Sequence, residues 1–334
     1  MAYIYRKTIG DKSYYYLRIS KRIKDKLVVK DIAYLGSNIE DVKNNLSKLH
    51  SYQKEIRKGY KSIKKALDSN YYLEKVRGKK LKEDGFLQKD MLEQIEAARL
   101  HYKTKFLKHD ELTLKEAYKH FLIDFAFNTT SIEGNTITLN EAQHLLVENI
   151  LPKDKTLREV YDLQNTESVF FWLLGNRPVI KEELAVMIHD RLLDRIDVRK
   201  GYRTHDIRVF KSRFESTPFM YIGTDMKLLF KWYEEQKKKL HPFALSVIFH
   251  HKLEKIHPFS DGNGRTGRML MNFILIKNKY PPFVISNKRR KEYLDAMNKA
   301  DLSGLTKTNL NEYGELVQFA AEEMISTYWN NFNI

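Results

Sequence analysis

The spacing of apolar residues changes along the chain, and each change predicts a different kind of element. The opening residues are rich in strand formers and are broken by turn-like residues, which predicts a small β unit over residues 1–38. After that unit, apolar side chains recur every three to four positions, which predicts helices over 39–67 and again over 87–107. The polar stretch over 70–85 predicts a connection between these two helical regions.

Beyond residue 110 the helix starts are marked by a recurring spacing. Thr113, Thr138 and Thr156 are each followed three residues later by a Glu, the spacing of a capping box. Further helical periods cover roughly 180–194, 224–239, 242–255, 265–278, 288–300 and 310–330. The remaining two-thirds of the chain is therefore expected to be helical.

A short stretch between residues 203 and 222 departs from the helical period. Ile207 and Val209, followed by Phe219 and Tyr221, predict the two arms of a β-hairpin. The expected fold class is mainly α, with a β-hairpin flap in a helical core and a small β unit with Lys-rich helices ahead of it. The expected divisions are the β unit over 1–38, a helical region over 39–109, and the remaining 110–334.

Composition excludes several classes of protein. Hydrophobic residues make up 42% and charged residues 31%, the mix of an ordered globular chain. There is no Cys, so disulfides and thiolate chemistry are excluded, which agrees with a reducing cytoplasm. No apolar run approaches the roughly 20 residues that span a bilayer, and the N-terminus lacks a signal peptide. We expect a cytoplasmic protein with no membrane partner.

Positive charge is concentrated in the first quarter of the chain. Of a net charge of +16, residues 1–80 contain 21 Lys and Arg against 8 Asp and Glu, together with ten of the twenty Tyr. Such a stretch is suited to bind nucleic acid or an acidic partner by electrostatic attraction and stacking. The simpler interpretation is a Lys-rich solvated face. Both interpretations stay open at this point.

The candidate chemistry lies in the stretch 257–268, HPFSDGNGRTGR, between two helical runs. A glycine-rich turn that leads into a helix presents backbone amides and a positive dipole to an anion. Arg265 and Arg268, one helical turn apart, add cationic donors for phosphate oxygens. Asp261 offers a hard oxygen ligand for Mg²⁺, and His257 can accept a proton near neutral pH. The combination indicates phosphoryl or nucleotidyl transfer to an acceptor hydroxyl.

This stretch resembles the signature of Fic proteins, His-x-Phe-x-Asp/Glu-Gly-Asn-Gly-Arg-x-x-Arg, at every fixed position. The resemblance implies transfer of AMP from ATP to a Ser, Thr or Tyr hydroxyl of a target protein. It implies that His257 deprotonates the acceptor and that Asp261 holds Mg²⁺ against the phosphates. The nucleotide-binding residues that it implies are Gly262, Asn263, Gly264, Arg265, Arg268 and Tyr293. For Tyr293, which resembles an aromatic near the adenine in relatives, packing in the core is the alternative.

A second motif lies well ahead of the signature. Residues 129–135, TTSIEGN, resemble the family's inhibitory motif, Ser/Thr-x-x-x-Glu-Gly/Asn, in the class whose inhibitory helix precedes the core. The resemblance implies an ion pair between Glu133 and Arg268 that denies this arginine to the γ-phosphate. It covers the Fic region over 110–334, with the inhibitory helix over about 113–133 and the core over about 180–320.

The predicted flap has a counterpart in the family as well. There, the corresponding segment receives the target peptide as an added β-strand. The resemblance therefore implies that a target protein docks beside Ile207 and Val209.

Other functions remain open. With Glu133 positioning a water, the same fold could remove AMP from modified targets. His-Asp dipeptides at His109, His189 and His205, with His250-His251, would suit a metal-dependent phosphohydrolase if they converged on one metal. A nucleic-acid-binding protein whose Fic core only senses nucleotide would use the basic first eighty residues. The target protein and the formation of a homodimer are also left open.

Overall fold

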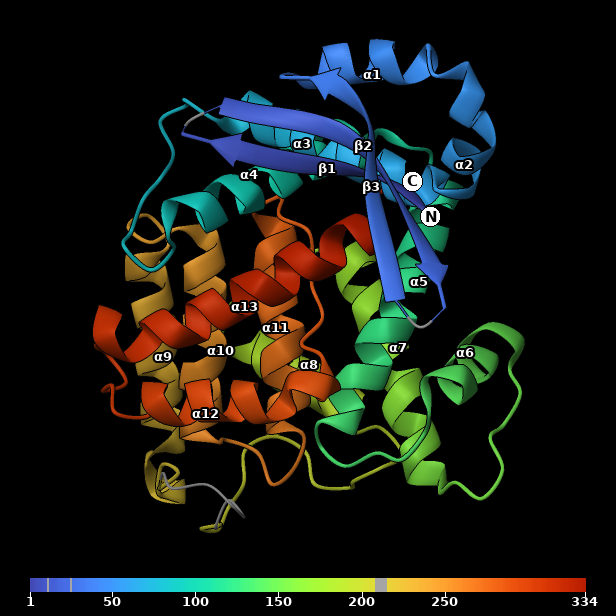
Figure 1. Cartoon of the computed structure of the whole chain (residues 1–334). Coiled ribbons are helices and arrows are strands. Elements are labelled where there is room, and N and C mark those ends of the chain that lie inside the picture. The colour runs from blue at the N-terminus through green and yellow to red at the C-terminus, as the bar shows by residue number, and fades with distance from the viewer. Residues whose placement is uncertain (11, 25, 208–214) are drawn as a thin grey trace.

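The computed structural model describes residues 1–10, 12–24, 26–207 and 215–334 (Figure 1). Within these residues the chain forms thirteen α-helices, short 3-10 turns and one three-stranded sheet at the N-terminus. The expected class, mainly α with a small β unit in front, is confirmed. None of the helices in the described residues is both long and apolar enough to cross a membrane.

The N-terminal sheet is an antiparallel meander with one buried face. Its strands are β1 (Ala2–Ile9), β2 (Lys12–Ile23) and β3 (Lys26–Gly36), in the order β1-β2-β3. The helices that follow are α1 (Ile39–Ser47), α2 (Gln53–Lys58) and α3 (Tyr60–Val76). Leu17, Ile19 and Leu35 pack against Val42 and Ile63 in a core separate from that of the helical body. The sheet is therefore stabilised by helices that come directly after it in sequence.

Helix α3 extends through part of the stretch expected to be a connection. Leu73 and Val76 are buried against Ala97 of α4 (Lys89–Thr104). The burial of these two side chains stabilises the helix as far as residue 76. Glu74 also ties the helix to the sheet, because its two carboxylate oxygens accept from the Tyr15 hydroxyl at 2.9 Å and the Ile39 amide at 3.2 Å. The predicted connection over 70–85 is thus wrong in its first part.

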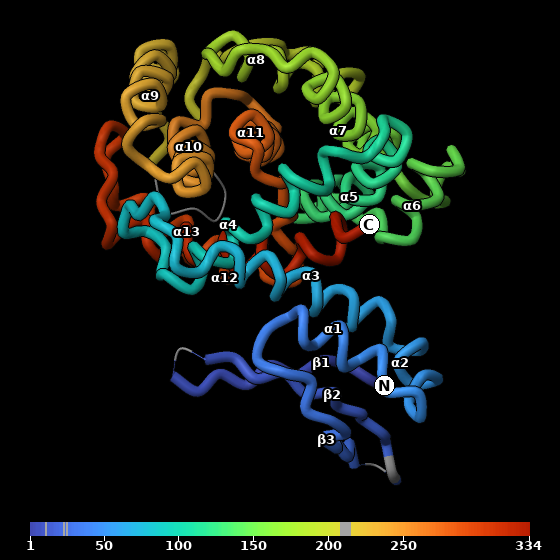
Figure 2. Tube along the Cα trace, turned by 90° about the horizontal axis from the view of Figure 1, so that it is seen from above, coloured from blue at the N-terminus to red at the C-terminus, as the bar shows by residue number. Residues whose placement is uncertain are grey.

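The helical body agrees with the predicted periods. Its helices are α5 (Glu111–Ser131), α6 (Leu139–Glu148), α7 (Leu157–Asn176), α8 (Glu182–Leu192), α9 (Ile222–Gln236), α10 (Pro242–Ile256), α11 (Asn263–Lys277), α12 (Arg290–Ala300) and α13 (Leu310–Asn331). Figure 2 shows α11 in the middle, with α5, α8 and α10 around it. Residues 263–275 of α11 are all buried, so the N-terminus of this helix opens inside the molecule.

Two local predictions need correction. Helix α5 begins at Glu111 rather than at a Thr113 cap, because the Asp110 side chain accepts from the Thr113 amide at 3.0 Å. The capping boxes at Thr138 and Thr156 are present.

The second arm of the predicted hairpin is also wrong. Residues Phe219–Tyr221 form a 3-10 turn that leads into α9, and the Asp206 carboxylate accepts from the Phe219 amide at 2.8 Å. Pro218 precedes this turn and has no amide proton with which to extend a ladder. Ile207 is half-buried and lies outside any strand, and Val209 falls outside the described residues.

Lys252 fixes the loop after α12 from inside the body. Its side chain is buried, and its ammonium donates to the carbonyl oxygens of Gly304 at 3.2 Å, Leu305 at 2.7 Å and Lys307 at 2.6 Å. The three donors of an ammonium group match these three carbonyl acceptors. One α10 residue therefore holds the segment that follows the candidate site.

We expect Lys252→Met to lower the free energy of unfolding by about 2 kcal/mol, because three carbonyl groups lose the donor that ties their loop to α10. Lys231→Met, at an exposed position of α9, is the matched control and should change stability little. Urea unfolding followed by circular dichroism measures both. Equal stability of the two variants would contradict this role for Lys252.

Candidate active site

The loop between α10 and α11 is held in one shape by its own residues. His257 ends α10 in the left-handed conformation, with φ of 53°, and Gly262 caps α11 with φ of 72°. A Cβ at Gly262 would overlap Leu193, so only glycine fits there. The Asn263 side chain accepts from the Phe259 amide and donates to the Phe259 carbonyl, each at 2.9 Å. Asn263 thus closes the loop on itself through its side chain.

Phe259 anchors the loop to the core. It is buried, and its ring stacks on His189 of α8 with the centroids 3.9 Å apart. This stack fixes the loop relative to α8.

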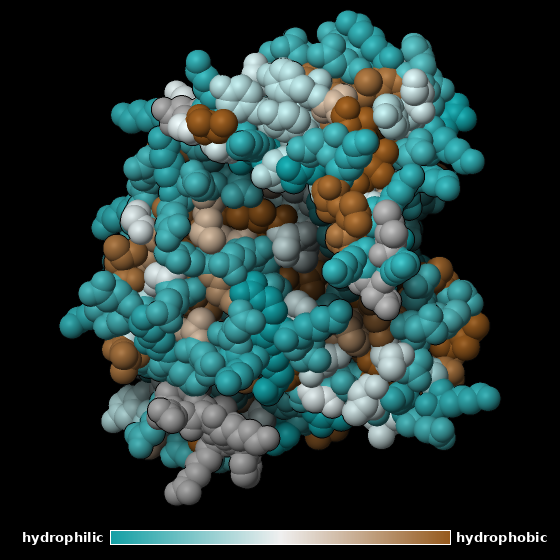
Figure 3. All heavy atoms as spheres, viewed as in Figure 1, coloured by the Kyte–Doolittle hydropathy of each residue, from teal (hydrophilic) through white to brown (hydrophobic). Residues whose placement is uncertain are grey.

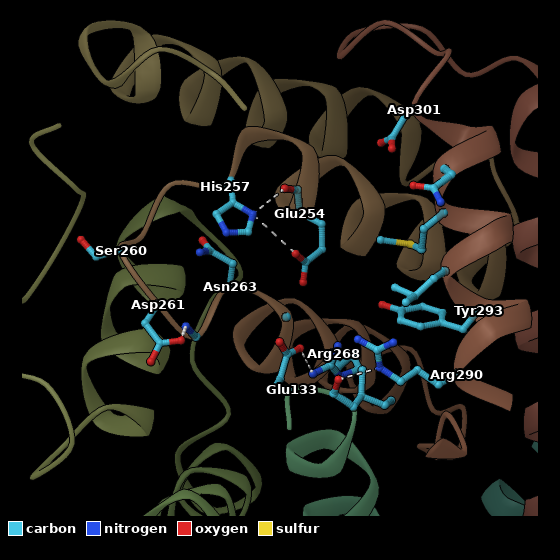
Figure 4. Close-up of a pocket in the computed structure, with 16 residues that line it drawn as sticks. Glu133, Glu254, His257, Ser260, Asp261, Asn263, Arg268, Arg290, Tyr293 and Asp301 are labelled. Carbon is cyan, nitrogen blue, oxygen red and sulfur yellow. Dashed lines mark hydrogen bonds and ion pairs between the residues drawn. The ribbon is translucent and has the colours of Figure 1, made fainter. Parts of the chain in front are cut away.

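A cavity of about 310 Å³ lies in front of this loop. Figure 4 shows His257 and Asp261 on one side of it, Tyr293 and Asp301 on the other, and Glu133 beside Arg268. The sequence-predicted residues that line it are Glu133, His257, Asp261, Gly262, Asn263, Gly264, Arg268 and Tyr293. Residues nearly 170 positions apart in the chain therefore meet at one site.

The side chain of Glu133 forms an ion pair with Arg268. Glu133 lies in the turn just after α5, and its Oε1 accepts from Arg268 Nη2 at 2.7 Å. The buried guanidinium also donates to Thr129 Oγ1 at 2.8 Å and to the Thr129 carbonyl at 2.9 Å. Burial alone would lower the pKa of Arg268, but the Glu133 carboxylate, together with Tyr293 and Glu254, more than offsets this and raises it. The arginine is therefore charged, and the end of α5 supplies its acceptors.

Glu133 also covers the N-terminus of α11. A Cβ added at Gly264 would overlap Glu133 Oε1, so the carboxylate rests directly on this glycine. The start of a helix favours an anion because its amides and dipole face outward there. Arg290 holds the turn in place by donating to the Ile132 carbonyl at 2.9 Å. The Glu133 carboxylate thus occupies the space where a bound anion would lie.

His257 lines the cavity, and its imidazole is in a form that can accept a proton. Its Nδ1 donates to the Glu254 carbonyl at 3.2 Å, which leaves the lone pair on Nε2. Burial lowers the pKa of the imidazole from its ordinary 6.5, and the partly opposing effects of Glu254, Glu133 and Asp261 do not restore it. The ring is therefore neutral at pH 7, the form that can accept a proton.

Glu254 is a site residue that the sequence analysis missed. It lines the cavity one helical turn before His257, and its Oε2 lies 3.8 Å from His257 Nδ1. Burial, and then the Glu133 carboxylate, raise the pKa of Glu254 well above the usual range. Its spacing of three residues from His257 on an apolar helix was the available signal.

Arg265 does not reach the cavity, in contrast to the expectation that it would share a face with Arg268. Its buried guanidinium pairs with Asp162 of α7 and lies 3.3 Å from Asp261. Because Asp162 comes from another helix, the spacing of the two arginines could not reveal this partner. Arg265 therefore contacts the loop from behind, through Asp261.

The Asp261 carboxylate lies at the rim of the cavity. Its side chain is 32% exposed and is contacted by Arg158 as well as Arg265. These two arginines outweigh burial and lower the pKa of Asp261, which keeps the group charged. A single accessible carboxylate fits Mg²⁺, which keeps most of its shell as water and substrate phosphate. The residues present are therefore compatible with that ion.

The histidines that suggested a metal-dependent phosphohydrolase do not converge. In the described part of the chain no group of three or more His, Asp or Glu side chains could hold a metal ion. His189 bonds Asp190, His250 bonds the Tyr293 hydroxyl at 2.6 Å, and His251 bonds Asp301 at 2.9 Å. Each therefore has a packing role within the helical body.

Arg203 is a second residue that the sequence analysis missed. Its amide donates to the Pro258 carbonyl at 3.0 Å and its Nε to the His257 carbonyl at 2.9 Å. The two Nη atoms donate to the carbonyl oxygens of His205 and Thr217. The buried Arg203 guanidinium thus links His205 and Thr217, on either side of the predicted flap, to the backbone of His257, the candidate base.

We expect Gly264→Ala to destabilise the wild type more than the Glu133→Gly variant, by about 1 kcal/mol, because the added methyl overlaps Glu133 first. Thermal or urea unfolding of the four proteins in this double-mutant cycle measures the difference. The same cost in both backgrounds would mean that Glu133 does not rest on Gly264.

The buried helical core and its glycine-rich loop define a Fic-type domain. Residues 179–275 of the chain match the Fic/DOC family.

Two curated relatives are named protein adenylyltransferases. That of Caenorhabditis elegans, fic-1, is 28% identical over 189 residues, which cover 54% of this chain and 37% of the relative. That of Culex quinquefasciatus is 29% identical over 204 residues, covering 56% and 39%. The matched part of the chain thus spans less than two thirds of the length of these relatives.

The fold has a counterpart among solved structures. A Fic domain containing signalling protein from Bacteroides thetaiotaomicron superimposes with a TM-score of 0.62 at 23% identity, covering 70% of this chain and 94% of that one. Because the superposition covers 70% of this chain, it supports a Fic-type fold for the helical body.

Proposed function

We propose that this protein transfers AMP from ATP to a Ser, Thr or Tyr hydroxyl of a target protein and that Glu133 inhibits the reaction. The observation that carries the proposal is the meeting of His257, the N-terminus of α11 and Arg268 around one cavity. A proton acceptor beside an anion-binding helix start suits the attack of a hydroxyl on a nucleotide phosphate. The adenylyltransferase names of the curated relatives support the same reaction.

The roles follow from the contacts of each residue. His257 accepts the proton of the target hydroxyl at Nε2, since its Nδ1 donates to a carbonyl. The amides of Gly262, Asn263 and Gly264 stabilise the negative charge on the phosphates, and Arg268 binds the terminal one. Arg265 acts indirectly, by holding Asp261 in its ionised form at the rim. The catalytic unit is then residues 110–334, with α5 as the inhibitory helix.

Asp261 is the residue that would hold Mg²⁺. Bound there, the ion would neutralise phosphate charge and help orient the nucleotide. Arg158 contacts the same carboxylate and must move aside or share it. Tyr293 and Asp301 close the opposite side of the cavity, where the nucleoside fits.

Inhibition follows from competition between two anions. The Glu133 carboxylate and the terminal phosphate of ATP both require Arg268 and the space over Gly264. While Glu133 is in place, the triphosphate lacks the contacts that would aim its α-phosphorus at the target. A target protein would dock beside the segment that Arg203 ties to His257, the segment that contains Ile207 and Val209.

We expect Glu133→Gly to raise AMP transfer at least about tenfold, because Arg268 and the start of α11 become available to the triphosphate. Adding His257→Ala to this variant should lower the rate about a hundredfold or more, through loss of the base. The measurement is intact mass of the protein, and of added acceptor proteins, after incubation with α-labelled ATP and Mg²⁺.

The matched control is Glu148→Gly, an exposed Glu at the end of α6, which should behave as wild type. Equal transfer by wild type and Glu133→Gly would contradict the inhibitory role. Transfer that persists in the double variant would remove His257 as the base.

We expect the rate of AMP transfer by Glu133→Gly to stay high down to pH 6.5 and to fall only below it. Burial lowers the pKa of His257, so the neutral, proton-accepting form persists to a lower pH than for an exposed histidine. Removing the Glu133 carboxylate lowers that pKa further, because its charge favours the protonated ring. The pH–rate profile measures this, with thermal unfolding across the same range to exclude loss of fold. An acid limb centred above pH 6.5 would contradict the assignment.

A further inference from the structure

The sheet has one face that no described helix covers. Tyr3, Tyr5, Tyr14, Tyr16, Tyr34 and Arg18 share this face, because they alternate with the buried residues and pair across the strands. Helices α1 and α3 pack on the opposite face, where Leu17 and Leu35 are buried. In Figure 2 the sheet lies at one end of the molecule, with α3 between it and the helical body. We call these six residues the tyrosine face.

The rings of the tyrosine face lie close to one another. Tyr34 is 52% exposed, and its ring centroid lies 5.4 Å from that of Tyr16 and 6.5 Å from that of Tyr14. The Arg18 guanidinium lies 3.3 Å from the centroid of the Tyr5 ring. Figure 3 shows a pale patch of intermediate hydropathy over the sheet, with hydrophilic and some hydrophobic side chains around it. A row of aromatic rings on an open sheet is not needed to fill a core.

The surroundings of the tyrosine face are strongly basic. Residues 1–38 contain nine Lys and Arg against three Asp and Glu, and seven of the nine basic residues are exposed. Lys7 pairs with Tyr14 across the strands, and Arg22 lies on the same face beyond Arg18. Among the described residues, Asp31 lies on this face and is paired with Arg18. The charge therefore favours a polyanion, and the rings favour a ligand with flat surfaces of its own.

We propose that the tyrosine face binds single-stranded nucleic acid. Tyrosine rings stack on the bases, and the surrounding Lys and Arg contact the phosphates, the combination found where proteins bind unpaired strands without sequence preference. A duplex keeps its bases stacked on each other, so it offers the rings no flat surface and is held by charge alone. The proposal is independent of AMP transfer, because none of these residues lines the cavity of the active site.

The test is fluorescence anisotropy of the full chain with a labelled 20-nucleotide DNA strand, the corresponding RNA strand and the matching DNA duplex. Each is titrated at 50 and 200 mM salt. Tyr16→Ala/Tyr34→Ala removes two rings without changing charge. Tyr60→Ala is the matched control, since Tyr60 is 61% exposed on α3 in the same N-terminal region but away from the sheet face. Circular dichroism checks that each variant is folded.

We expect both single strands to bind more tightly than the duplex and all binding to weaken as salt rises. The double variant should lose about tenfold or more in affinity for the strands, while its salt dependence is unchanged and Tyr60→Ala behaves as wild type. Polyglutamate, a polyanion without bases, should bind weakly. The proposal is wrong if no strand binds at 50 mM salt, if the duplex or polyglutamate binds as tightly as the strands, or if Tyr60→Ala has the same effect as the double variant.

Discussion

The ion pair between Glu133 and Arg268 is the interaction on which the active site depends. A guanidinium as deeply buried as that of Arg268 needs an anion within reach, because leaving the charge without one is costly. In this structure Glu133 supplies the anion from the end of a helix remote in sequence. Under the function proposed above, a phosphate of ATP would supply the anion instead, so Glu133 and the nucleotide would satisfy the same electrostatic requirement. On the proposed mechanism one anion replaces the other, so Arg268 keeps an anionic partner in both states.

The rest of the domain holds the residues around Arg268 in fixed positions. Helix α11 is buried along most of its length, so its first two turns, with Gly264 and Arg268, cannot shift to accommodate a different ligand. Asn263 closes the loop ahead of it, and Phe259 fixes the loop against His189. Arg203 joins the backbone at His257 to the segment beside which the target is proposed to dock. On the proposed mechanism only the Glu133 side chain has to leave Arg268, and this side chain is 43% exposed.

Much of the site could be predicted because its residues are consecutive. The stretch 257–268 sets its own geometry, through a helix end, a glycine turn and a helix start, and these are encoded locally. The contact of Glu133 with Arg268, in contrast, spans the chain and was predicted only from family resemblance.

The errors share a physical cause, which is that tertiary contacts decide them. Arg265 points to Asp162 on another helix, α3 continues because α4 covers Val76, and Asp110 lies one turn ahead of Thr113 as a better cap. Arg203 was missed because a lone charged residue in a loop has no distinctive pattern, and for Glu254 the only signal was its spacing of three residues from His257. Their importance becomes visible only once the backbone brings them to His257.

The most direct test of competition between Glu133 and the terminal phosphate is a pair of crystal structures with a non-hydrolysable ATP analogue and Mg²⁺. One would be of the wild type and the other of Glu133→Gly. We predict that the terminal phosphate contacts Arg268 only in Glu133→Gly, and that in the wild type Glu133 keeps its ion pair while the triphosphate bends away. A wild-type complex in which Arg268 binds the terminal phosphate while still paired with Glu133 would contradict the account.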